Sequence, residues 1–446
     1  MNIMISLSEI SHQSDSSHRS HAIVIGGSMA GMLAARVLSE HFDQVTLIER
    51  DRFSESPASR PGVPQARHFQ VLLSRGLNIV EGLFPKLSEE MIAAGAVEID
   101  AGADLAWLNP AGWGINFKSG LKALSFSRDL LDWSVRRRVP AIPNIRLLEN
   151  CEMMELITNE RRDAIAGVLF RYRNQSDGAA GKEDWLAADL VVDAGGRASK
   201  IPQWLSEIGY EPPAETAINA HPGYASRLYK IPADFNADRK ALAQASPPEH
   251  IRGGIMFAIE GDRWIVTLAG RDRDYPPTDE EGFLTFARSL RNPLIYEAIK
   301  NAEPLTPITG DRGTENRWRH YELLERWPES LIAIGDSVCS FNPVYGQEMA
   351  TAPIGAEWLD KCLREQSGDL NGLARRFQRG LARLYADPWM LSTGEDYPLP
   401  QRPGRDAEPD EPLYASLRGS GAAGRHAQRQ SPPAIPRSAG NAQTTY

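Results

Sequence analysis

Short apolar runs bounded by glycine or polar residues recur along the chain and predict buried strands that alternate with helices. Residues 21–25 (HAIVI) form the first run, and residues 45–49 (VTLIE) form the second. Between them, residues 29–38 place small and apolar side chains at helical spacing. Strands that are apolar on both faces are typical of a parallel sheet covered by helices. The start of the chain therefore predicts a β–α–β unit.

The middle of the chain has a different pattern, with partly alternating strands and turn residues between them. Residues 224–231 predict one strand, and residues 254–259 and 263–269 predict a hairpin around Glu260-Gly261-Asp262. These segments predict a mostly antiparallel sheet. Five aromatic residues are expected to belong either to the core or to an apolar wall that faces a substrate: Trp107, Trp113, Phe117, Phe257 and Trp264.

A helix is expected to follow and to cover this sheet. Thr278 and Glu281 have the spacing of a capping box at a helix start. Apolar residues then recur at three to four positions, as on the buried face of a helix, and the helix is expected to end before Pro293. The apolar positions of that face are Phe283, Phe286 and Leu290.

Composition and charge exclude several classes of protein. The chain has 446 residues, of which 42% are hydrophobic, and its formal net charge is -9 with acidic and basic residues intermixed. This does not resemble the basic surface of a nucleic-acid-binding protein. No stretch approaches the roughly 20 apolar residues of a membrane helix, so we expect no stable membrane insertion. The widely spaced Cys151, Cys339 and Cys362 fit neither a zinc site nor a disulfide framework, and they favour the reducing cytoplasm. The sequence does not indicate an oligomeric state.

The turn after the first predicted strand is rich in glycine. In β–α–β units the first glycine permits a tight turn, and the helix N-terminus offers N–H groups to a pyrophosphate. An acid that ends the second strand accepts from ribose hydroxyls. Gly26, Gly31 and Glu49 can fill these roles, whereas the GxGxxG fingerprint is broken by Ser28, with Gly27 one position early. The motif predicts a dinucleotide and leaves NAD and FAD open, with a glycine turn that serves only packing as the alternative.

Three landmarks occur in a fixed order: VIGGSMAG at residues 24–31, VVDAGGRAS at 191–199 and IAIGDSVCSFNPVYGQEM at 332–349. In this order they resemble the FAD-dependent aromatic-hydroxylase-like (group A) monooxygenases. The segments RPGVPQARHFQVLLSRG (60–76), LLDW and DRWIVTL look like the bacterial polyether epoxidase branch of that family. The resemblance covers residues from about 21 to about 400.

The resemblance implies roles for particular residues. Asp336 would accept from a ribityl hydroxyl of FAD, Pro343 would lie close to the flavin, and N–H groups of residues 346–349 would stabilise negative charge on the reduced ring. Arg128 would contact the FAD phosphate region, and Met153 lies where the family contacts adenine. With the glycine turn, the expected cofactor-binding residues are Gly26, Gly27, Ser28, Met29, Ala30, Gly31, Glu49, Arg50, Arg128, Met153, Asp336, Pro343, Gly346, Gln347 and Met349.

The resemblance also implies an activity in secondary metabolism. NAD(P)H would reduce FAD, and O2 would supply one oxygen atom to a small apolar organic substrate, by epoxidation of an alkene or by hydroxylation. No metal is required, and the sequence identifies no catalytic acid or base; Arg67 and His68 are candidates only because they lie in the 60–76 segment. A flavin-dependent halogenase and an isoprenoid-type flavin reductase stay open as alternatives. Ser28, Ala194 and Glu348 depart from the family pattern and keep a non-catalytic flavoprotein open as well.

The expected fold class is α/β, with an interrupted Rossmann-like FAD-binding domain and an inserted α+β substrate domain built on a mostly antiparallel sheet. The low-complexity ends are expected to be disordered. The expected boundaries are a leader at 1–20, the FAD-binding domain at 21–60, 128–202 and 325–365, the substrate domain with connecting segments at 61–127 and 203–324, a helical segment at 366–400 and a tail at 401–446.

Overall fold

The structure is a computed structural model. It describes residues 20–70, 72, 74–109, 111–173, 181–233, 235, 240–244, 250–312, 315–342, 348–366 and 368–394. The expected leader (apart from Ser20) and the tail at 401–446 lie outside the described residues, as do Pro343, Gly346, Gln347 and the side chain of Glu348.

A five-stranded sheet forms the centre of the larger hydrophobic core. Its order is β19-β11-β1-β2-β7, and every pair of neighbours is parallel. Nearly every side chain of β1 and β2 is buried, which explains why these strands are mostly apolar. Because the strands run parallel, the loops after β1, β2, β11 and β19 emerge at one edge. The strands are β1 (His21–Ile25), β2 (Gln44–Ile48), β7 (Ile145–Leu148), β11 (Leu190–Asp193) and β19 (Leu331–Ala333).

Helices and a small antiparallel sheet cover this sheet. α1 contacts β1, β2 and β11 and packs along α8, which in turn packs on α2 and α9. The three-stranded sheet β10-β9-β8 contacts β2 and β11. The helices are α1 (Met29–Leu38), α2 (Ser74–Leu83), α3 (Leu87–Ala93), α4 (Arg128–Arg136), α5 (Ile201–Glu207), α8 (Glu348–Gln366) and α9 (Leu373–Gly394). The sheet strands are β8 (Cys151–Thr158), β9 (Ile165–Tyr172) and β10 (Glu183–Ala187).

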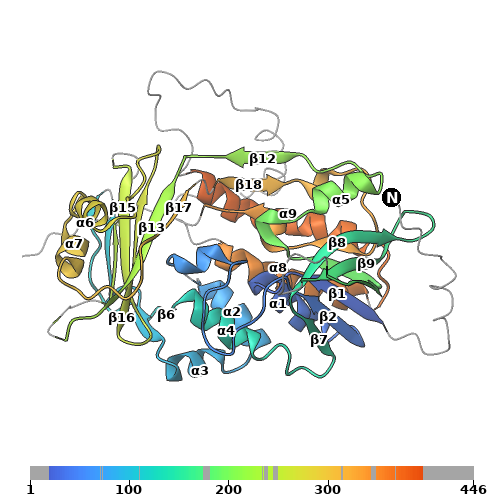
Figure 1. Ribbon diagram of the computed structural model, residues 1–446, viewed down its shortest axis with the longest axis horizontal. Coiled ribbons are helices and arrows are strands. Elements are labelled where there is room, and N and C mark those ends of the chain that lie inside the picture. The colour runs from blue at the N-terminus through green and yellow to red at the C-terminus, as the bar shows by residue number, and fades with distance from the viewer. Residues whose placement is uncertain are drawn as a thin grey trace, which may run out of the picture. The chain divides into compact units, whose positions relative to one another are not determined.

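A seven-stranded sheet forms the second core. Its order is β17-β13-β16-β15-β14-β4-β5, antiparallel except between β14 and β4. α6 (Glu280–Arg288) and α7 (Leu294–Ile299) lie on the side of this sheet that faces away from β1 and β2 (Figure 1). The strands are β4 (Leu105–Asn109), β5 (Gly112–Trp113), β13 (Gly223–Lys230), β14 (Ala241–Gln244), β15 (Arg252–Ile259), β16 (Arg263–Gly270) and β17 (Thr309–Arg312).

Two small sheets complete the described strands. The first has the order β12-β18-β20, and the second pairs β3 with β6. Their strands are β3 (Val97–Asp100), β6 (Lys122–Ser125), β12 (Glu215–Ile218), β18 (Asn316–Arg319) and β20 (Cys339–Ser340). The short 3-10 helices are η2 (Pro64–Arg67), η3 (Gly196–Ala198), η4 (Tyr321–Leu323) and η5 (Gly335–Ser337). The fold is thus mixed α/β, as predicted, and the domain boundaries stay a prediction.

The predicted hairpin is confirmed as β15 and β16, but the predicted capping box is wrong. The N-cap of α6 is Asp279, whose carboxylate accepts from the Gly282 N–H at 2.8 Å. Asp279 is one residue later than Thr278, and a carboxylate there also suits the positive end of the helix dipole. The helix ends at Arg288, before Pro293 as expected, and Pro293 occupies the N-cap position of α7.

The aromatic residues of this part do not share one environment. Trp264 is a core residue with an exposed fraction of 3%, and the ring of Phe257 packs against that of Phe69 in a tilted arrangement with centroids 4.3 Å apart. Trp107, Trp113 and Phe117 are 52%, 42% and 59% exposed, so the expectation of core packing is wrong for these three. Alternating patterns identify a strand, but they do not show whether another element covers it.

Candidate functional site

A pocket opens where the loops after β1, β2 and β11 meet. It encloses about 750 Å³ of empty space, part of which is open to solvent. The expected cofactor residues that line it are Gly26, Gly27, Ser28, Glu49, Arg50 and Met153. Lining residues outside the expected cofactor set include Cys151, Asp193 and Ser199, the last two from the second landmark, and Lys200 and Trp204, which the sequence did not single out.

The glycine turn brings the N-terminus of α1 to this pocket. Gly26 has φ +96°, and a Cβ there would lie 2.5 Å from the Ala194 carbonyl oxygen. A Cβ on Gly31 would lie 1.7 Å from the Gly26 carbonyl oxygen, so the helix packs directly on the turn. Ser28 is the N-cap residue of α1, but its side chain makes no capping hydrogen bond, and the first turn has no acidic residue. The first N–H groups of α1 therefore stay available to an anion. Met29 and Ala30 belong to this first turn.

Glu49 connects the loops after β1 and β2. Its carboxylate accepts from the Gly27 N–H at 2.6 Å and from the Asp51 N–H at 2.8 Å. Its Oε2 also lies 3.4 Å from Nη1 of Arg60. The carboxylate is buried, so these contacts hold it in place beside the pocket.

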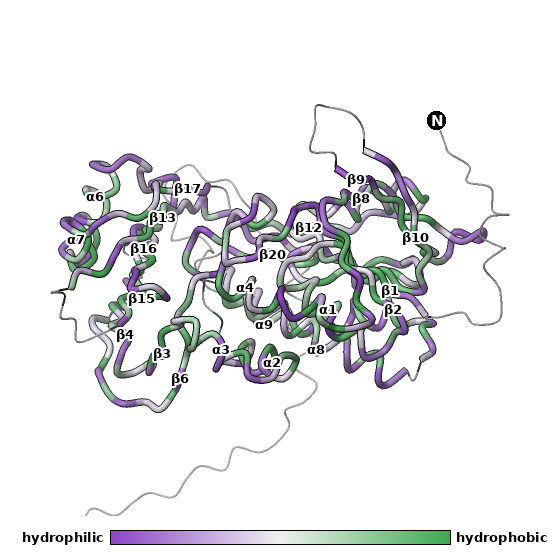
Figure 2. Tube along the Cα trace, turned by 60° about the horizontal axis from the view of Figure 1, so that its bottom comes forward, coloured by the Kyte–Doolittle hydropathy of each residue, from purple (hydrophilic) through white to green (hydrophobic). Residues whose placement is uncertain are grey.

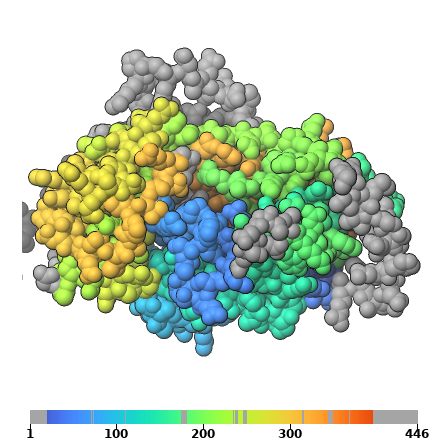
Figure 3. Space-filling view, viewed as in Figure 1, coloured from blue at the N-terminus to red at the C-terminus, as the bar shows by residue number. Residues whose placement is uncertain are grey.

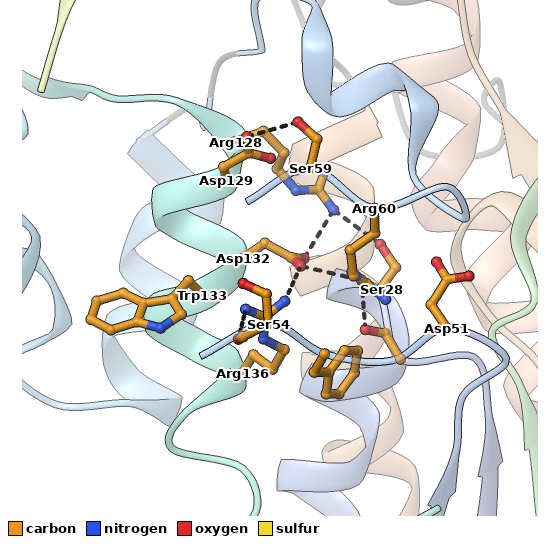
Figure 4. Close-up of polar contacts among 12 residues, drawn as sticks. Ser28, Asp51, Ser54, Ser59, Arg60, Arg128, Asp129, Asp132, Trp133 and Arg136 are labelled. Atoms are coloured by element: carbon orange, nitrogen blue, oxygen red, sulfur yellow. Dashed lines mark hydrogen bonds and ion pairs between the residues drawn. The ribbon is translucent and has the colours of Figure 1, made fainter. Parts of the chain in front are cut away.

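Behind the glycine turn lies a buried cluster of arginines and carboxylates (Figure 4). Nη2 of Arg60 donates to the Gly27 carbonyl oxygen at 3.1 Å and to Oδ2 of Asp132 at 3.2 Å. The Asp132 carboxylate also faces Arg128 at 3.6 Å and Arg136 at 3.9 Å. Sequence reasoning missed this cluster, although Arg60 begins the RPG segment and Asp132 lies in LLDW. No short-range spacing signals a pair 72 residues apart.

Arg128 joins three segments of the chain. Its Nη2 donates to the Ser28 hydroxyl at 3.0 Å, and its Nη1 lies 2.7 Å from Oε1 of Gln70 and 2.9 Å from the Met349 sulfur. The side chain is buried, yet its Nε has no hydrogen-bond partner among the described residues. A buried N–H without a partner is costly, so a bound acceptor at this place would stabilise the fold.

The second and third sequence landmarks also meet at this edge of the sheet. The Gly196 N–H donates to the Ser337 hydroxyl at 2.9 Å, and a Cβ on Gly196 would lie 4.0 Å from Cβ of Asp336 in η5. Burial raises the pKa of Asp193, although the Ser199 and Ser337 hydroxyls counteract it. The structure thus brings the three landmarks together.

The weak catalytic candidates lie elsewhere. Arg67 is exposed at the end of η2, and neither it nor His68 lines the described pocket. His68 is buried against the seven-stranded sheet, with Nδ1 2.7 Å from the Ser226 hydroxyl, which in turn lies 2.6 Å from the Thr267 hydroxyl. In Figure 3 the blue surface of this early part of the chain lies between the yellow and orange surface and the green surface in the lower part of the view. His68 therefore fastens the 60–76 segment to the sheet.

His68 predicts a specific acid sensitivity. Burial lowers the pKa of His68. The negative charge of Asp311 raises this pKa somewhat, and the positive charge of Arg67 lowers it further. The unfolded chain binds a proton below about pH 6.5 while folded His68 stays neutral, so the free energy of unfolding falls as the pH drops from there towards the lowered pKa. His68→Asn keeps a polar atom near the Nδ1 position but does not titrate. We expect the wild type to lose more stability than H68N between pH 7 and pH 5 in urea denaturation. Equal losses would contradict this, since His21 is present in both proteins.

Comparison of the sequence with known proteins identifies relatives of this chain. No family model matches the chain. Protein Rv3254 of Mycobacterium tuberculosis H37Rv is 34% identical over 380 residues, which are 84% of this chain and 79% of that protein. The chain belongs to the family of Protein Rv3254. The FAD-dependent oxidoreductase LodB of Marinomonas mediterranea is 23% identical over 378 residues, covering 83% of this chain and 91% of LodB.

Solved structures of flavin-dependent enzymes share the fold. The myxobacterial halogenase CndH has a TM-score of 0.64 at 16% identity and covers 90% of this chain and 89% of its own. PqsL from Pseudomonas aeruginosa, a probable FAD-dependent monooxygenase, has a TM-score of 0.60 at 16% identity. The match covers 84% of this chain and 94% of the PqsL chain. The brominase Bmp2 has a TM-score of 0.60 at 14% identity, and the match covers 85% of this chain and 91% of the Bmp2 chain. The fold of this Rv3254-family protein is that of FAD-dependent oxidoreductases, with monooxygenases and halogenases among them.

Proposed function

We propose that this protein is an FAD-dependent monooxygenase that uses NAD(P)H and O2 to insert one oxygen atom into a small apolar organic substrate. The observation that carries the proposal is the uncapped N-terminus of α1, which meets the glycine turn at the pocket, where Ser28 accepts a hydrogen bond from Arg128 behind it. This is the arrangement that a dinucleotide pyrophosphate requires. The similarity to LodB and PqsL, which are described as FAD-dependent, favours FAD over NAD as the resident cofactor.

The described residues fit FAD. Gly26 and Gly31 let the backbone approach the pyrophosphate, and the first N–H groups of α1 with Arg128 would balance its charge. The Glu49 carboxylate would accept from ribose hydroxyls, and Asp336 would accept from the ribityl chain. Bound FAD would accept a hydride from NAD(P)H and react with O2. The loop at 343–347, which the resemblance places beside the flavin ring, lies outside the described residues.

The proposal of an apolar substrate is based on the side chains on one face of the seven-stranded sheet, the face opposite α6 and α7. Phe257 and Ile255 alternate with Met256 and Ala258, which pack in the core with the helices. Phe257 is covered in part by Phe69 from the 60–76 segment. An apolar surface of this kind would favour an alkene or an aromatic ring, so epoxidation and hydroxylation both belong to the proposal. The buried, unpaired Cys151, Cys339 and Cys362 are in keeping with a cytoplasmic location.

A flavin-dependent halogenase is the second candidate, because CndH and Bmp2 share the fold over most of their length. Monooxygenase and halogenase differ in the atom that reaches the product. They can therefore be separated by one experiment on the holoenzyme.

The test begins with anaerobic reduction by NADH or NADPH, with and without polyene or aromatic substrates. ¹⁸O2 is then added in the presence of chloride or bromide, and the products are analysed by mass spectrometry. We expect reduction to respond to the substrate and the product to contain one ¹⁸O atom. A halogen in the product would favour the halogenase, and a product with neither ¹⁸O nor halogen would indicate a reductase. Peroxide as the only product after substrate-insensitive reduction would count against both oxygenation and halogenation. Protein that stays colourless with added FAD would favour the non-catalytic alternative.

A further inference from the structure

The last residue of β5 and the connection from β5 to β6 carry large apolar side chains outside the core. Trp113, Ile115, Phe117 and Leu121 are 42%, 85%, 59% and 67% exposed, and we call this set the apolar ridge. Three of them recur at a spacing of two residues. In Figure 2, β4 and β6, which bracket the ridge in the chain, lie at the margin of the view, away from β1 and β2. Exposed apolar residues that are scattered singly are ordinary, but a contiguous group of this kind indicates a contact surface.

The ridge is held in a defined conformation. The Asp100 carboxylate accepts from the backbone N–H groups of Gly102, Ala103, Ser119 and Gly120 at 2.8 to 3.0 Å, and from the Ser119 hydroxyl at 2.6 Å. These hydrogen bonds hold the pKa of Asp100 well below its usual range, and the bond from the Ser119 hydroxyl has the largest effect. The carboxylate is therefore charged at neutral pH and fastens the end of the connection that precedes β6 to the turn after β3. The apolar side chains are thus presented by an ordered loop.

Charge indicates the chemistry of the partner. Between residues 105 and 122 the charged residues are Lys118 and Lys122, both exposed, in a chain with a net charge of -9. Asp100 is the cross-strand neighbour of Lys122, and its carboxylate is taken up by the hydrogen bonds described above. Lys122 lies 3.9 Å from Glu98, a weak contact because both side chains are more than half exposed. Asp104 lies 3.4 Å from Lys240, so this carboxylate already has a cation beside it. An apolar ridge with a tryptophan and flanking lysines has the composition of a segment that enters the interface of an anionic membrane.

We infer that the apolar ridge docks this protein on the surface of membranes that contain anionic lipid. Ile115, Phe117 and Leu121 enter the boundary between headgroups and acyl chains, and Lys118 and Lys122 contact lipid phosphates. The docking is peripheral, because no described helix is long and apolar enough to cross a membrane. A symmetric pair of ridges in a dimer would bring the lysines of two copies together, which disfavours a second copy as the occupant.

Vesicle flotation tests this inference on the full-length holoenzyme. We expect binding to phosphatidylcholine vesicles that contain about 30% phosphatidylserine, and weaker binding to pure phosphatidylcholine. The variant I115S/F117S/L121S is expected to reduce the bound fraction roughly tenfold, because each substitution removes apolar area that would be buried in lipid. K118E/K122E is expected to abolish the preference for phosphatidylserine, and raising KCl from about 0.05 M to about 0.5 M is expected to weaken it.

The matched control removes exposed apolar side chains elsewhere. L323S/M390S changes residues that are 60% and 57% exposed in η4 and α9, and it is expected to bind vesicles as the wild type does. All variants should keep the wild-type FAD content and thermal midpoint, because the changed side chains are exposed. Wild type that does not float with anionic vesicles, or a control that loses as much binding as the ridge variant, would overturn the inference. So would a dimer that the ridge substitutions dissociate while vesicle binding is absent.

Discussion

Gly31→Ala is expected to destabilise the protein by on the order of 3 kcal/mol and to lower its FAD affinity at least about tenfold. The added Cβ would lie 1.7 Å from the Gly26 carbonyl oxygen and 2.9 Å from the carbonyl carbon. Both atoms belong to the backbone of the turn, so no side chain can rotate away to relieve the clash. α1 would have to move away from the turn, and its N-terminal N–H groups would move with it. Denaturant unfolding of the apoprotein and titration with FAD measure the two effects separately.

Gly82→Ala is the matched control for this substitution. Gly82 is exposed in α2, and nothing lies within 4 Å of the position of its Cβ. Alanine is a better helix former than glycine by up to about 1 kcal/mol, so G82A should be as stable as the wild type or more stable, with unchanged FAD affinity. If G31A unfolded and bound FAD like G82A, the close packing of α1 on the glycine turn would be disproved.

Arg60→Met is expected to cost about 3 kcal/mol, the lower end of the range for removing one partner of a buried ion pair. The substitution takes a cation away from both Glu49 and Asp132, which are buried. The lower end applies because Glu49 keeps two backbone N–H donors and Asp132 keeps Arg128 at 3.6 Å. The bond from Arg60 to the Gly27 carbonyl oxygen is lost as well, so FAD affinity should fall with stability.

Two further variants make this prediction specific. R75A breaks the exposed pair of Arg75 with Glu357, which are 3.1 Å apart, and should cost no more than about 1 kcal/mol. R60M/D132N removes the carboxylate that R60M leaves without its partner, so the double variant should be more stable than the sum of the single changes predicts. Additive losses, or a cost of R60M no larger than that of R75A, would show that Arg60 is not coupled to Asp132.

Local patterns predicted the elements that flank the pocket. The bounds of β1 and α1 agree with those expected, because continuous apolar runs and helical spacing record burial directly. The glycine turn and Glu49 were expected near a nucleotide because loops after parallel strands meet at one edge, and they do line a pocket there. The roles of these residues towards FAD stay predictions.

Other parts of the site could not be predicted in this way. The Arg60–Asp132 pair spans 72 residues and the Arg128–Ser28 bond spans 100. A sequence pattern shows that a charged residue stands in a segment, but it does not show which distant charge will face it. The helix α6 begins one residue later than expected, so its cap is Asp279 and not Thr278. Local patterns do not fix a helix start to within one residue.

The amino-acid sequence by itself determined the order of strands and helices, the glycine turn and the three landmarks, because these depend on neighbours in the chain. Only the tertiary structure decided that the landmarks meet at one edge of the parallel sheet and that Arg60 and Arg128 lie behind the turn. It also decided that His68 faces the sheet and that the apolar ridge stays uncovered. Burial and ion pairing depend on which distant segments pack together, and no local spacing contains that information.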